Sequence, residues 1–137
     1  MNNIWVPVYK ILSDTTFLDI TSFNYDLDSI KLILIDDNNK EISVEANEII
    51  NFSYTNEQVL YLNEFNFTSD VDRKDFPHHF FYKVTNSTLI KQFVHDSANL
   101  LNANDLEHFL IRLSDGLFNI VCRNDNFEIR DINWYVW

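Results

Sequence analysis

The stretch that decides the fold is Leu106–Leu113 (L-E-H-F-L-I-R-L), followed by Ser114-Asp115-Gly116 and Leu117–Cys122 (L-F-N-I-V-C). Two apolar, aromatic-containing runs separated by a short polar turn with a glycine are typical of a β-hairpin. Gly116 is the only glycine of the chain, and we expect it at a left-handed position of that turn. Phe127–Ile132 follows a second polar turn, so the pattern predicts a three-stranded meander.

A second hairpin is predicted near the N-terminus. Ile30–Ile35 reads I-K-L-I-L-I, Asp36–Lys40 is a polar turn, and Glu41–Ala46 reads E-I-S-V-E-A. In the second run, apolar and polar residues alternate, as in a strand with one buried face. The first run is apolar on both faces, which predicts a central strand of the sheet.

Other strands are predicted on both sides of this hairpin. Ile4–Leu12 reads as a strand that lies at a sheet edge or carries a bulge, because Pro7 lacks an amide donor. Ile49–Tyr54 and Gln58–Leu62 suggest another strand pair, joined by Thr55-Asn56-Glu57. A further strand is expected at Phe80–Val84 after a long loop, Asn63–Pro77.

One helix is predicted, from about Thr88 to Leu101. Its apolar residues recur at helical spacing, and Asn86 or Ser87 can cap its N-terminus. The order of elements favours a single α+β domain over residues 1–137. We expect a mainly antiparallel sheet with the helix packed on one face, followed by the meander. Whether the sheet stays open or curls into a half-barrel is left open.

The composition combines a strongly acidic balance with a large apolar content. The net charge is −11 over 137 residues, yet 46% of the residues are hydrophobic, so a folded domain with an acidic surface is expected. This charge argues against nucleic-acid binding and against attraction to anionic membranes. No apolar run is long enough to span a bilayer, and the sole cysteine, Cys122, favours a reducing, cytoplasmic location.

Motifs for catalysis or cofactors are weak. A single glycine rules out the glycine-rich phosphate loops, and the four histidines lack the spacing of a metal site. The acidic stretches Asp36–Glu41 and Ser69–Asp72 do not match a calcium loop. A Cys122–His108 pair across the last hairpin is the one nucleophilic arrangement imaginable, and a buried apolar role for Cys122 is the stronger interpretation. We therefore expect no enzyme activity, cofactor or metal.

The acidic residues are the main functional lead. Residues 1–68 contain three lysines and eleven acidic residues, which gives a net charge of −8. Residues 69–137 contain seven basic and ten acidic residues, which gives −3. The first of these regions is therefore expected to attract a basic protein partner. The predicted partner-binding carboxylates are Asp26, Asp28, Asp36, Asp37, Glu41, Glu45 and Glu48. The alternative is a generic solvated acidic face.

Three segments carry a resemblance to a known class of proteins. Tyr82–Ile90 (Y-K-V-T-N-S-T-L-I), His108–Ile111 (H-F-L-I) and Asp115–Val121 (D-G-L-F-N-I-V) resemble small acidic immunity proteins of bacterial polymorphic-toxin and contact-dependent inhibition systems. The resemblance implies a non-catalytic inhibitor that covers a basic, nuclease-like toxin domain. Alternative functions are an adaptor or self-associating module and, less favoured, a small enzyme.

Overall fold

The computed structural model describes residues 3–9, 15–56 and 79–132. Strands dominate this part of the chain, with one α-helix and one short 3-10 helix. In chain order the elements are β1 (Ile4–Tyr9), β2 (Leu18–Asp26), β3 (Ser29–Asp36), β4 (Glu41–Ala46), β5 (Ile49–Asn56), β6 (Phe81–Thr85), α2 (Thr88–Asp96), η4 (Ala103–Asp105), β7 (Leu106–Leu113), β8 (Gly116–Arg123) and β9 (Phe127–Ile132).

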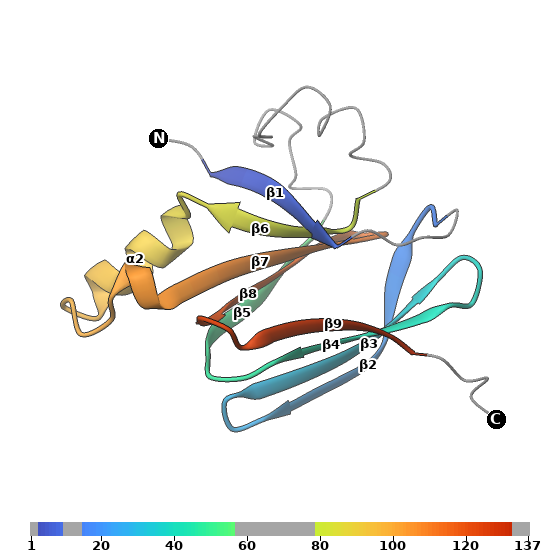
Figure 1. Cartoon of the computed structure of the whole chain (residues 1–137), viewed down its shortest axis with the longest axis horizontal. Coiled ribbons are helices and arrows are strands. Elements are labelled where there is room, and N and C mark those ends of the chain that lie inside the picture. Colours follow the sequence, from blue (N-terminus) through green and yellow to red (C-terminus); the bar gives the residue numbers. More distant parts are fainter. Residues whose placement is uncertain (1–2, 10–14, 57–78, 133–137) are drawn as a thin grey trace.

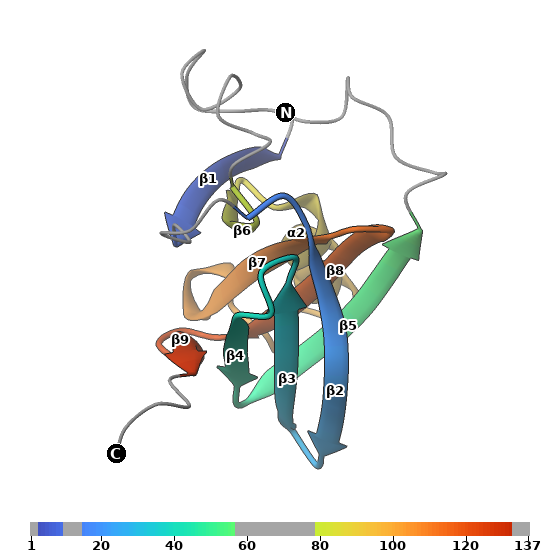
Figure 2. The same cartoon turned by 90° about the vertical axis from the view of Figure 1, so that its right-hand side faces the viewer.

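These strands form two antiparallel sheets, which do not close into a barrel in the described part of the chain (Figure 1). One sheet has the order β1-β6-β7-β8-β5 and the other has the order β2-β3-β4-β9. The chain changes sheet between β1 and β2, at the β4–β5 turn and again at the β8–β9 turn. Figure 2 shows the two sheets as crossing layers, with β2 and β5 along the same side.

The main core lies between the two sheets. Leu34 and Val44 from one sheet and Phe81, Ile111 and Ile120 from the other are completely buried in a single apolar cluster. The alternation predicted for β4 is confirmed, because Ile42, Val44 and Ala46 all face this core. Burial of this apolar area is the main force that holds the sheets together.

Helix α2 covers the opposite face of the larger sheet at one end. Ile90 packs against Leu106 and Val121 there, and the Ser87 side chain caps the helix by accepting a hydrogen bond from the Ile90 amide. The helix ends at Asp96, earlier than the predicted Leu101, because Ala98 and Asn99 adopt left-handed φ angles of 55° and 66°. Leu100 is consequently 90% exposed.

Several topological expectations are confirmed. Strand β3 is central, with β2 and β4 as its neighbours. Strand β1 lies at the edge of the larger sheet, and its pairing with β6 shifts register between Pro7 and Tyr9, so both consequences expected of Pro7 occur. The α+β class with antiparallel sheet and one α-helix is also confirmed.

The prediction of a three-stranded meander is wrong for its last strand, because β9 does not pair with β8. Strand β8 has β7 on one side and β5 on the other, so no free edge is left for β9. The chain therefore crosses to the second sheet, where β9 pairs with β4. There Phe127 stacks on Phe109 of the larger sheet, with ring centroids 3.9 Å apart.

Two local expectations also need correction. A turn was predicted at Thr55 and Asn56, but both residues continue β5 and pair with β8. The strand predicted at Gln58–Leu62 and the loop predicted at Asn63–Pro77 lie outside the described residues. Gly116 does not have a positive φ angle. Its role is close packing, since a Cβ atom at this position would lie 2.2 Å from the Thr55 carbonyl oxygen.

Candidate interaction surface

Three turns from distant parts of the chain meet at one end of the molecule. The Ile49 amide donates to the Asp28 carbonyl oxygen over 2.9 Å, which ties the β2–β3 turn to the β4–β5 turn. The Asn47 amide donates to the Asn126 carbonyl oxygen, also over 2.9 Å, and so adds the β8–β9 turn. Figure 1 shows these turns together on the left of the molecule. We call this end the turn cluster.

The turn cluster gathers carboxylates from both halves of the sequence. Helix η4 joins it through the Asn124 amide, which donates to the Asp105 carbonyl oxygen. The exposed acidic residues of the cluster are Asp26, Asp28, Glu48, Asp105 and Asp125. Arg123 is the one exposed basic residue on these turns, and none of the ion pairs found among the described residues involves any of these five carboxylates.

Two glutamates shape the turns of this cluster. Glu48 has a left-handed φ angle of 49°, and its carboxylate accepts a hydrogen bond from the Asn126 side-chain amide over 2.8 Å. Glu107 lies beneath the exposed acids, where it accepts from the Asp125 amide and pairs with Lys83 over 2.8 Å. Burial tends to raise the pKa of Glu107, but the hydrogen bonds from Lys83 and Asp125 outweigh it and hold that pKa below its usual value.

An exposed apolar strip leads along the edge strand β2 into the turn cluster. Phe23 is 43% exposed, Tyr25 is 53% exposed and Leu27 is 86% exposed. Leu27 also has a left-handed φ angle of 58°, which is unfavourable for a leucine by about 1–2 kcal/mol. The tight β2–β3 hairpin therefore holds an apolar side chain in solvent between Asp26 and Asp28.

Aromatic rings support this strip from the facing edge strand. Phe52 of β5 contacts Phe23 and Tyr25, with ring centroids 5.5 Å and 5.0 Å away, and it stacks on Phe118 at 6.0 Å. Such ring pairs add about 0.5–1.5 kcal/mol each beyond simple burial. The side of the molecule between β2 and β5 is therefore a preformed aromatic surface beside a cluster of acidic residues.

The seven carboxylates predicted from the sequence are not on one surface. Asp26, Asp28 and Glu48 lie in the turn cluster, whereas Asp36 and Asp37 lie at the other end of β3. In contrast to the expectation, Asp36 is buried, and its carboxylate supports the β3–β4 turn by accepting from Thr15 and from the amides of residues 38 and 40. The Asp37 carboxylate accepts hydrogen bonds from the Thr16 amide and from the Thr16 hydroxyl. These bonds, chiefly the one from the amide, lower the pKa of Asp37.

The remaining two predicted residues lie on the outer face of the smaller sheet. Glu41 and Glu45 share this face, as expected from their spacing. Glu45 pairs with Lys31 over 3.5 Å, and Glu128 beside it hydrogen-bonds to Arg130. Two of the acids on this face are therefore already balanced by neighbouring cations, unlike the exposed acids of the turn cluster.

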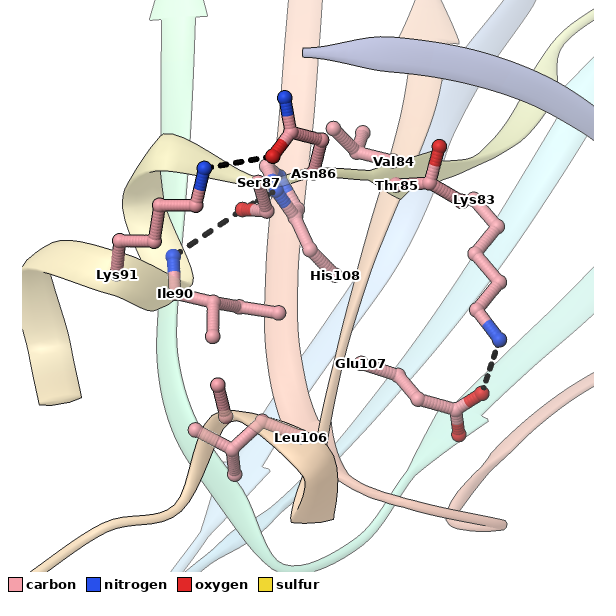
Figure 3. A pocket seen from close by; sticks show the side chains of 11 residues that line it. Lys83, Val84, Thr85, Asn86, Ser87, Ile90, Lys91, Leu106, Glu107 and His108 are labelled. Carbon is pink, nitrogen blue, oxygen red and sulfur yellow. Dashed lines mark hydrogen bonds and ion pairs between the residues drawn. The ribbon is translucent and has the colours of Figure 1, made fainter. Parts of the chain in front are cut away.

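A cleft of about 220 Å³ beside helix α2 is lined in part by Ser87 and His108, which belong to a buried polar network (Figure 3). His108 Nδ1 lies 2.8 Å from Ser87 Oγ, and its Nε2 lies 2.7 Å from Asn119 Oδ1. Asn119 Oδ1 can only accept, so the ring proton lies on Nε2; the neutral ring then accepts at Nδ1 from the Ser87 hydroxyl, whose oxygen in turn accepts from the Ile90 amide. Ser87 and His108 are both buried, so the network fastens the start of α2 to the sheet.

The Cys122–His108 pair weighed from the sequence does not form. Cys122 points into the core between the sheets, whereas His108 is on the opposite face of β7. Burial, with a smaller effect of the Glu107 charge, raises the pKa of the Cys122 thiol to about 12. The thiol therefore stays protonated and unreactive at neutral pH.

Because His108 is buried, we expect the protein to become less stable in mild acid. Burial lowers the pKa of His108, so below about pH 6.5 the unfolded chain binds a proton that the folded state resists. The free energy of unfolding should therefore fall as pH drops from 7 to 5, by about 1.4 kcal/mol for each unit of pKa difference. Urea unfolding at several pH values measures this effect. His108→Gln should flatten the profile, whereas His95→Gln on the exposed end of α2 should not; equal profiles for both variants would contradict the assignment.

Comparison with known proteins gives no relative: no family model, curated protein or solved structure matches the chain. In the segments that the structure describes, three or more potential metal ligands do not cluster anywhere. The same segments contain no helix with the length and apolarity needed to cross a membrane.

Proposed function

We propose that this protein is a non-catalytic, cytoplasmic binding protein that inhibits a basic protein, in the manner of an immunity protein covering a toxin domain. The observation that carries the proposal is the turn cluster, where five exposed carboxylates from four chain segments meet around a single exposed arginine. Exposed apolar side chains of Phe23, Tyr25 and Leu27 lie next to this cluster, so contact area and charge stand side by side, and both contribute to protein-binding sites.

The electrostatics explain why such a surface favours a cationic partner. Like charges held close together repel one another, and the approach of a basic surface relieves that repulsion. Long-range attraction then raises the association rate, while the exposed Tyr25 and Leu27 supply contact area once the surfaces meet. The free thiol of the sole cysteine is consistent with a reducing compartment, where such an inhibitor would act.

Affinity capture from native cells tests the proposal, and the captured protein is then purified and its activity assayed. We expect a basic protein whose activity is blocked at a 1:1 ratio. Its association rate constant should fall at least about tenfold between about 0.02 M and 0.5 M salt. A captured partner that is neutral, that binds equally fast at both salt concentrations, or that keeps its full activity would refute inhibition of a basic protein.

One observation favours self-association as a second candidate function. Strand β2 pairs only with β3 in the described sheet, so its outer edge offers unpaired backbone groups next to exposed Phe23 and Tyr25. The net charge of −11 opposes contact between two copies, and screening by salt should relieve this repulsion. Sedimentation equilibrium separates the two functions, since self-association should strengthen as salt is added whereas binding of a basic partner should weaken.

A further inference from the structure

A second cleft lies at the opposite end of β2 from the turn cluster. Its volume is about 360 Å³, and its lining residues come from both sheets. They are Asp19, Ile20, Tyr54, Leu113, Asp115 and Phe118. The lining thus combines apolar walls, two aromatic rings and two carboxylate residues, and it contains no basic residue.

Specific contacts hold the cleft open. The Ser114 amide donates to the Leu18 carbonyl oxygen over 2.9 Å, and the Ser114 hydroxyl donates to the Asp19 carboxylate. On the other side, the Tyr54 hydroxyl donates to the Asp115 carbonyl oxygen over 2.8 Å. These bonds join the start of β2 to the β7–β8 turn and fix the Tyr54 ring as a wall of the cleft.

We propose that this cleft binds an arginine side chain of the basic partner; the inference rests on the proposed function. The aliphatic stem fits the walls formed by Ile20 and Leu113, while the guanidinium reaches the Asp19 and Asp115 side chains. The Tyr54 and Phe118 rings offer faces on which a planar cation stacks. Arginine suits the site better than lysine because its flat guanidinium stacks on rings and donates to two carboxylates at once.

The cleft is continuous with the aromatic surface described above. Phe118 lines the cleft and also contacts Phe52 and Phe23, with ring centroids 6.0 Å and 6.2 Å away. From Asp19 to its end at Asp26 the edge strand β2 extends about 23 Å, at about 3.3 Å per residue. An extended segment of about eight partner residues would therefore reach from the arginine cleft to the turn cluster.

The test is an NMR titration of the whole chain with N-acetyl-arginine methylamide. We expect saturable amide shifts at the cleft residues with a dissociation constant on the order of millimolar. The lysine derivative should bind more weakly, and the citrulline derivative, which has nearly the same shape without the charge, should produce no saturable shift. The proposal would be overturned if the citrulline derivative bound as strongly as the arginine derivative. It would also be overturned if arginine gave no saturable shifts because a second copy or the chain itself fills the cleft.

A variant pair links the cleft to its residues and to the partner. Asp19→Asn with Asp115→Asn should weaken arginine binding at least about tenfold. The control, Asp96→Asn with Glu128→Gln, makes the same charge change outside both the cleft and the turn cluster and should leave arginine binding unaltered. Arginine binding without any captured basic partner would refute the proposed function alone. If a basic partner binds the wild-type protein and the cleft variant equally well, the proposed function stands, but the cleft is not part of the binding surface.

Discussion

Replacing Gly116 with alanine should lower the free energy of unfolding by about 3 kcal/mol and the melting temperature by roughly 10 °C. The new Cβ atom would lie 2.2 Å from the Thr55 carbonyl oxygen, which belongs to the backbone of β5 and cannot rotate away. It would also lie 2.7 Å from the Tyr54 hydroxyl oxygen. To relieve the clash, β5 must move away from β8 at the place where the two strands pair. Thermal and urea unfolding measure the loss.

Two further variants separate close packing from turn conformation as the reason for the glycine. If Gly116 were needed for a left-handed turn, Gly116→Asn would be tolerated better than Gly116→Ala. Because φ is not positive there, we expect asparagine to be at least as destabilising as alanine. Adding Tyr54→Ala to Gly116→Ala should not rescue stability, since the Thr55 carbonyl oxygen remains in place. Rescue by that second change would show that the tyrosine ring causes the clash.

Gly116 illustrates what the sequence could and could not predict. The hairpin of β7 and β8 was predicted because local apolar patterning and a short polar turn suffice to identify it. The reason for the glycine depends on β5, whose residues are about sixty positions earlier in the chain. Nothing in the local pattern indicates which distant strand will pass at that point, so the glycine was assigned to the turn.

The same limit explains the misplaced final strand. Phe127–Ile132 has the alternation of a strand, and this part of the prediction is confirmed. Its partner was decided by competition for the edge of β8, which β5 occupies. Ile129 and Phe127 pack against the same core from the second sheet. Strand identity is thus encoded locally, whereas strand order depends on which edges remain free after the sheets assemble.

The acidic surface was predicted only in part for a related reason. Dividing the charge by sequence position favoured the first half of the chain and omitted Asp105 and Asp125. Folding brings these two residues to Asp28 and Glu48 because turns at one end of two packed sheets must meet. Asp36 was expected at the surface because it belongs to the predicted hairpin turn, but its side chain is buried and hydrogen-bonded within that turn and to Thr15.

Reversing charge in the turn cluster should abolish rapid binding of the basic partner. The variant Asp26→Lys, Asp28→Lys, Glu48→Lys adds two charge units at each position, so the net charge changes from −11 to −5. We expect the association rate constant at low salt to fall about 10- to 100-fold. Tyr25 and Leu27 would remain, but the cations beside them would now repel a basic surface. Stopped-flow association with the captured partner measures the rate.

The matched control places the same charge change on the outer face of the smaller sheet. Glu41→Lys, Glu45→Lys, Glu128→Lys also gives a net charge of −5, so a purely global effect of charge would slow both variants equally. Glu45 and Glu128 already pair with Lys31 and Arg130. Replacing these two glutamates therefore changes the electrostatic attraction for a partner less than replacing the acids of the turn cluster, which form no ion pair within the described segments. The turn-cluster variant should therefore bind at least about tenfold more slowly than this control. Equal rates would assign the attraction to overall charge, and a slower control would move the binding surface to the face that contains Glu41.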